Sequence, residues 1–149
     1  MYLVIPLLLA LALFMPWTGP ADPGNRMAAA NAADGLAEQA LIYHQAAVAY
    51  VLANPATSGT VTPAGLPASW TTTAVKACAN AKIVVTYVTV PTTISKPAVA
   101  SAIGRLWGGF PIVGQSTSNT VTNPYTGLGL PLPCVVPDRT PVIYSQAGG

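Results

Sequence analysis

Charged side chains are scarce in this sequence. Lys, Arg, Asp and Glu together make up 7% of its 149 residues, against about 25% in an average soluble protein. A charge-rich disordered chain needs low hydrophobicity, and a coiled coil needs Glu and Lys beside its seam. A chain that is 52% hydrophobic with net charge +2 fits neither class. No block of Lys or Arg occurs, so we expect no nucleic-acid partner, because phosphate contacts depend on cations.

Residues that catalyse reactions or bind metals are also few. His44 is the only histidine, and two cysteines cannot complete the usual four ligands of a structural zinc site within one chain. Serine-hydrolase, P-loop and zinc-protease motifs are absent. We therefore expect no enzymatic activity, cofactor, metal or small-molecule substrate, and we place His44 on the polar face of its helix. An exported enzyme that uses His44 or Asp138 is the lesser alternative. The four acidic residues form no obvious glycosidase pair: Asp22, Asp34, Glu38 and Asp138.

An apolar segment at residues 1–17 decides the compartment. It contains no charged residue, and as a helix it would span about 25 Å, slightly short of a hydrocarbon core of roughly 30 Å. Two interpretations compete: a signal peptide cut after Ala21, or an uncleaved anchor with Trp17 at the membrane interface. We favour the anchor, because Pro20 makes the cleavage site poor. The sequence thus predicts an exported domain held at a membrane by residues 1–17, with a cleaved, soluble exported domain as the alternative.

Cys78 and Cys134 are the only cysteines. Two cysteines in an exported domain most often pair. We therefore predict a Cys78–Cys134 disulfide, and two buried free thiols are the alternative.

The rest of the chain predicts an α+β domain. Residues 18–24 form a hinge of Pro and Gly, and residues 25–149 form the exported domain. An Ala-rich helix, Asn25–Asn54, precedes a small, mostly antiparallel sheet with one short helix. The expected later elements are strands at Lys82–Val90, Pro111–Thr117 and Thr140–Gln146 and a helix at Lys96–Trp107. We expect loops at Ala56–Trp70 and Thr126–Pro133.

The long helix carries a shallow apolar stripe, whose members fall on one face at helical spacing: Leu36, Ala40, Tyr43, Ala47 and Tyr50. Our candidate interface is this stripe without Ala40, that is, Leu36, Tyr43, Ala47 and Tyr50. Part of this stripe must pack on the sheet of the protein itself. Aromatic residues near turns, Trp70, Trp107 and Tyr125, are more often core than interface anchors.

Residues 38–61, EQALIYHQAAVAYVLANPATSGTV, carry a resemblance to a known family. The segment Tyr43–Tyr50 followed by Ala53–Pro55 and Ser58–Val61 is similar to the helix and turn of the PilM family of type IVB (thin) pilus systems of conjugative plasmids. The resemblance implies a non-enzymatic component of pilus biogenesis that binds other pilus-assembly proteins. It also implies that residues 1–17 lie in the bacterial inner membrane and residues 25–149 in the periplasm, with a soluble periplasmic protein as the alternative. It implies no catalytic residue.

Other functions remain open at this point. A cleaved, secreted binding domain and a minor pilin-like subunit are the alternatives. A prepilin is disfavoured, because Gly19 follows the apolar run and no Glu lies inside it.

Overall fold

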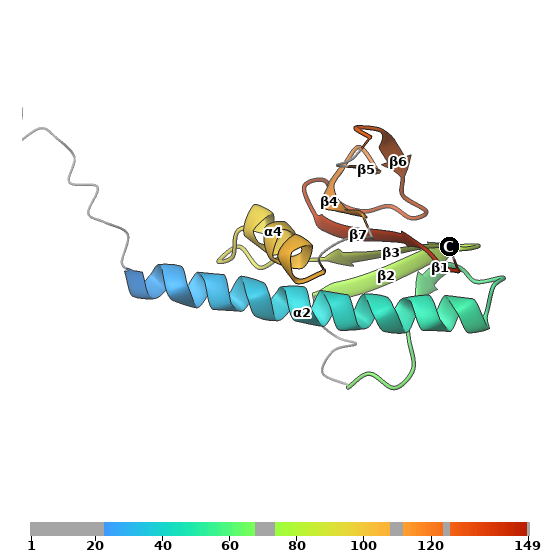
Figure 1. The fold of residues 1–149 in the computed structure, drawn as a ribbon, viewed down its shortest axis with the longest axis horizontal. Helices are drawn as coiled ribbons and strands as arrows, with labels where there is room; N and C mark the ends of the chain where they lie inside the picture. The colour runs from blue at the N-terminus through green and yellow to red at the C-terminus, as the bar shows by residue number, and fades with distance from the viewer. Residues whose placement is uncertain (1–22, 68–73, 108–111, 124–125, 149) are drawn as a thin grey trace, which may run out of the picture.

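The computed structural model describes residues 23–67, 74–107, 112–123 and 126–148, and these form an α+β domain. One long helix and one short helix accompany a curled antiparallel sheet of seven strands (Figure 1). In chain order the elements are α2 (Pro23–Ala53), β1 (Ser58–Val61), β2 (Val75–Asn80), β3 (Ile83–Val88), α4 (Lys96–Trp107), β4 (Ile112–Thr117), β5 (Thr120–Thr122), β6 (Gly129–Pro131) and β7 (Pro141–Gln146).

Helix α2 begins two residues before the predicted start. Pro23 occupies its first position, where a proline costs nothing because the first amides of a helix have no partner inside it. The helix ends at Ala53, and the next residue caps it: both the main-chain amide and the side-chain amide of Asn54 donate to the Tyr50 carbonyl. Pro55 then prevents continuation.

The sheet has the order β1-β2-β3-β7-β4-β5-β6, and every neighbouring pair is antiparallel. Strands β3 and β7 hold central places, as expected for their β-branched sequences.

The short helix was predicted with its exact bounds. The predicted loops were partly wrong: β1 lies in the first and β6 in the second, and β2 and β5 were not foreseen. These strands are short or rich in Ala and Gly, so they lack a period-two signal.

Both faces of the sheet are covered, each by its own apolar core. Val84 and Val88 of β3 point into a core shared with α2 and α4, whereas Val85 points into a second core on the opposite face. The second core is closed by the curled end of the sheet, where β5 and β6 rise away from α2 (Figure 1). Small residues on α2 allow it to approach the first core closely: Ala33, Ala37, Ala40 and Ala47.

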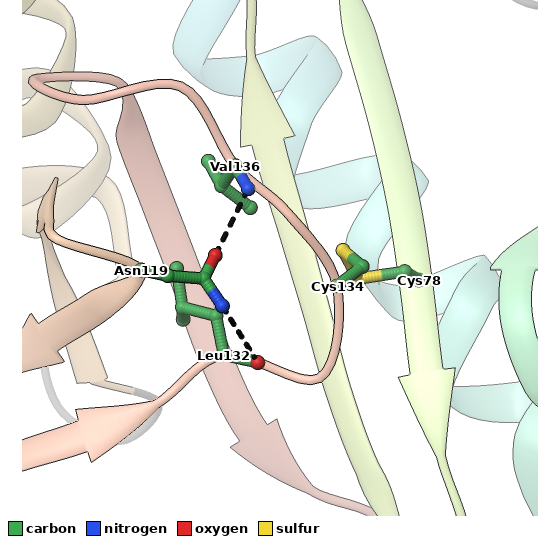
Figure 2. The surroundings of a disulfide bond; sticks show 5 residues. All are labelled: Cys78, Asn119, Leu132, Cys134 and Val136. Carbon is green, nitrogen blue, oxygen red and sulfur yellow. Dashed lines mark hydrogen bonds between the residues drawn. A yellow bond between two sulfur atoms is a disulfide. The ribbon is translucent and has the colours of Figure 1, made fainter.

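The predicted disulfide is present and fastens the second core to the sheet. Cys78 of β2 bonds to Cys134, which lies in the loop after β6 (Figure 2). The Asn119 side chain closes that loop, because its Nδ2 donates to the Leu132 carbonyl and its Oδ1 accepts from the Val136 amide. Asn119 therefore holds Leu132 and Val136, and the disulfide holds Cys134 between them.

Several predictions concern residues outside the described part. The anchor at residues 1–17, most of the hinge at 18–24, Trp70 and Tyr125 belong to this group, while Pro23 and Gly24 of the hinge fall in α2. Among the helices that the structure does describe, none has the length and hydropathy needed to cross a membrane.

Candidate functional site

A groove of about 770 Å³ runs between the second half of α2, the last residue of α4, the start of β4 and the end of β7. Most of its lining is apolar, and none of its lining residues is Asp, Glu, Lys or Arg. Clefts of this size and character are the usual places for binding in proteins of unknown function. The residues that line it are His44, Gln45, Val48, Ala49, Leu52, Trp107, Ile112, Tyr144, Ser145 and Gln146.

The outward face of α2 continues from this groove. Five exposed residues of α2 follow one another at spacings of four and three. We call them the outer stripe: Glu38, Ile42, Gln45, Ala49 and Leu52. Two of its apolar side chains are well exposed, Ile42 at 46% and Leu52 at 55%. From residue 39 to residue 53 the helix has no Asp, Glu, Lys or Arg. A helix that is apolar on all sides is normally buried on all sides, so this half of α2 has the composition of a helix with a further partner.

His44 lies beneath the groove rather than on a polar face, so that prediction was wrong. Its side chain is 1% exposed. Its Nδ1 lies 2.9 Å from Thr86 Oγ1 and its Nε2 lies 2.9 Å from Ser145 Oγ. The ring also meets Trp107 edge-on, with 6.0 Å between the ring centroids. Burial lowers the pKa of His44 from 6.5 to about 4, so the ring is neutral at physiological pH.

The Ser145–His44–Thr86 chain of hydrogen bonds has the order of a nucleophile, a base and an orienting group. Its chemistry differs from that of a serine hydrolase at the third member. A carboxylate there stabilises the imidazolium that forms when the serine is deprotonated, whereas Thr86 offers a neutral hydroxyl. Burial disfavours the same imidazolium. The arrangement therefore gives three polar side chains hydrogen-bond partners beside an apolar core, and it leaves His44 a weak base.

The residues of the candidate interface are divided between the interior and the surface. Tyr43 and Ala47 are buried in the first core, and the Tyr43 hydroxyl donates to the Val61 carbonyl. Leu36 is half-buried against that core, and Tyr50 is 37% exposed. Ala40, Tyr43 and Ala47 of the predicted stripe are buried and thus attach α2 to its own domain, whereas the outer stripe is exposed.

The acidic residues are far from forming one site. Asp34 pairs with Arg105 of α4 at 2.6 Å, an exposed contact between the two helices. Asp138 accepts from the amide of Ser118, which lies in the turn between β4 and β5. Among the described residues, no three His, Cys, Asp or Glu side chains lie close enough to hold a metal ion. Trp107 is half-buried and packs on the first core, as expected.

Most groove residues were missed in the sequence. Tyr144 and Ser145 were placed in a strand but given no role. Val48 entered only through the family resemblance, and Ala49 and Leu52 were given no role. The available signal was the lack of charge between residues 39 and 53, which one apolar stripe does not explain.

Comparison with known proteins gives one match. The PilM family model matches residues 7–144. No curated protein and no solved structure matches the chain.

Proposed function

The chain belongs to the PilM family, and on that premise we propose that it is a non-enzymatic component of type IV (thin) pilus biogenesis. The family match over residues 7–144 carries the general role in pilus biogenesis. The finer proposal is an inner-membrane protein, anchored by residues 1–17, whose periplasmic domain binds other pilus-assembly proteins.

Two observations support the location. Residues 1–17 are uncharged and apolar, as a membrane segment requires. The Cys78–Cys134 disulfide is typical of an oxidising compartment such as the periplasm. Cell fractionation with N-terminal sequencing tests the anchor: we expect full-length chain in the inner-membrane fraction. Mature protein that starts at Asp22 in the soluble periplasm would instead establish the cleaved, soluble alternative.

The groove and the outer stripe support a binding role. A surface that combines Leu52, Ala49 and Trp107 without charge gains free energy when it is covered, at about 25 cal/mol for each Å² of apolar area buried. The weak base at His44 supports binding over catalysis.

Complementation of a gene deletion tests the role. We expect deletion to remove thin pili and conjugation in liquid while pilin is still made, and we expect the wild-type gene to restore both. Leu52→Asp places a charge on the groove and fails to restore them. The matched control is Leu128→Asp, the same change at a leucine that is 66% exposed and lies in the turn before β6, and it restores both.

Ser145→Ala separates binding from catalysis. It removes the only hydroxyl placed on His44 Nε2, and we expect pili to form normally. Because Ser145 also lines the groove, loss of pili contradicts the non-enzymatic proposal when the variant folds, localises and still co-purifies with the assembly proteins that bind the wild type.

A further inference from the structure

We propose that a second copy of this chain covers the groove, with the outer stripes of the two α2 helices packed antiparallel about a two-fold axis. The inference concerns the same groove as the proposed function, and it rests on that proposal only for the claim that the groove binds protein.

The first argument is the composition of the outer stripe. Residues at alternating spacings of four and three form the seam along which two helices pack side by side. A two-fold contact brings one patch against itself, so a charged patch would repel its own copy. Between Ile42 and Leu52 the stripe is uncharged, and Ala49 near its middle lets the helices approach closely.

The second argument is the charge at the two ends of the stripe. In an antiparallel pair centred between Gln45 and Ala49, Ile42 of one copy faces Leu52 of the other. Glu38 then lies one turn further, beyond the end of the partner helix. A parallel pair would instead set Glu38 against Glu38.

Lys82 lies in the turn between β2 and β3, on the side of the domain toward which Glu38 of the second copy would extend. Asn80, two residues before it, pairs with Ser58 at the start of β1, just after α2 ends. The Lys82 carbonyl accepts from the Ala147 amide, and the next residue, Gly148, lies against Leu52. Both Glu38 and Lys82 are exposed, and the one ion pair within the described residues is Arg105–Asp34. The antiparallel pair therefore brings opposite charges together at both of its ends.

Disulfide trapping in membranes tests the pairing with the full-length chain. Two differently tagged copies are co-expressed, one with Ile42→Cys and the other with Leu52→Cys, and treated with a mild oxidant. We expect a mixed disulfide with a yield about tenfold above that of the control pair Ile42→Cys with Met27→Cys, a difference that corresponds to about 1.4 kcal/mol. Met27 is 69% exposed on the same helix but outside the stripe. Mass measurement verifies that Cys78 and Cys134 remain paired.

Three outcomes overturn the inference. Equal yields for the test and control pairs mean random collision. Efficient linkage of Leu52→Cys to a second Leu52→Cys copy means a parallel pair. The third concerns charge reversal. We expect Glu38→Lys and Lys82→Glu each to lower the yield of the mixed disulfide, and the double variant to restore it; an unchanged yield in either single variant, or no recovery in the double variant, overturns the inference.

The same variants separate this inference from the proposed function. If trapping fails while Leu52→Asp still abolishes pili, the groove binds another assembly protein and the second copy is ruled out. If trapping succeeds while Leu52→Asp leaves pili intact, the pair exists and the groove is not needed for biogenesis.

Discussion

His44 Nδ1 lies 2.9 Å from Thr86 Oγ1, which joins the middle of α2 to the centre of β3 across 42 positions of sequence. Thr86 is fully buried and His44 nearly so. Polar groups at such depth are costly unless they are hydrogen-bonded, and here each completes the other. The contact fixes both the position of α2 along the sheet and its rotation about its own axis, because the imidazole reaches Ser145 as well.

Stability depends on pH through His44. Its folded pKa of about 4 is lower than the unfolded value of 6.5, so the unfolded chain binds an extra proton between these two values. The free energy of unfolding is therefore constant above pH 6.5, falls by about 3 kcal/mol on acidification to pH 4, and is constant below it as far as this group is concerned. Urea unfolding at a series of pH values measures the fall. In His44→Gln the fall in the free energy of unfolding between pH 6.5 and pH 4 should vanish. If this variant shows the same fall as the wild type, the pH dependence does not come from His44.

Ala47 and Ala49 of α2 offer a matched pair of substitutions. Ala47 is 0% exposed, whereas Ala49 belongs to the outer stripe. Ala47→Asp buries an unpaired charge and lowers the free energy of unfolding by about 3–5 kcal/mol. Ala49→Asp changes it by about 0.5 kcal/mol or less. Equal losses in thermal unfolding would mean that α2 is rotated relative to the structure described here.

The disulfide contributes substantially to stability. It joins cysteines 56 positions apart, and a loop of that length corresponds to about 4 kcal/mol in the chain-entropy model. The double variant Cys78→Ala/Cys134→Ala should lose about that much in urea unfolding. Reduction of the wild type should produce a similar loss and should leave the double variant unaffected.

Asn119 can be dissected with two substitutions. Its side chain makes both hydrogen bonds that close the loop after β6, and its φ is 58°. Asn119→Gly removes the two bonds and keeps the backbone conformation, so we expect a loss of about 1–3 kcal/mol. Asn119→Ala should lose about 1 kcal/mol more, because alanine disfavours positive φ. If the glycine variant is as stable as the wild type, the side-chain bonds contribute nothing.

The sequence alone determined the elements whose signals are local. The exact bounds of α4 follow from Pro97 in its first turn and the pair of glycines after Trp107, and β3 follows from its β-branched residues. The disulfide followed from counting, because two cysteines allow one pairing. The weak strands β1, β2, β5 and β6 exist because neighbouring strands pair with them, and pairing leaves no mark in a short Ala- or Gly-rich segment.

Periodicity identified the inner side of α2, because Ala40, Tyr43 and Ala47 of the predicted stripe are buried in the first core. Only the tertiary structure decided that the other side of its second half, which is also largely apolar, lines a groove. His44 shows the same limit: a histidine among alanines looks solvent-facing until two hydroxyls from β3 and β7 are found within 2.9 Å of its ring nitrogens. Burial of a polar side chain depends on partners that are distant in sequence, and those partners are brought to it only by the fold.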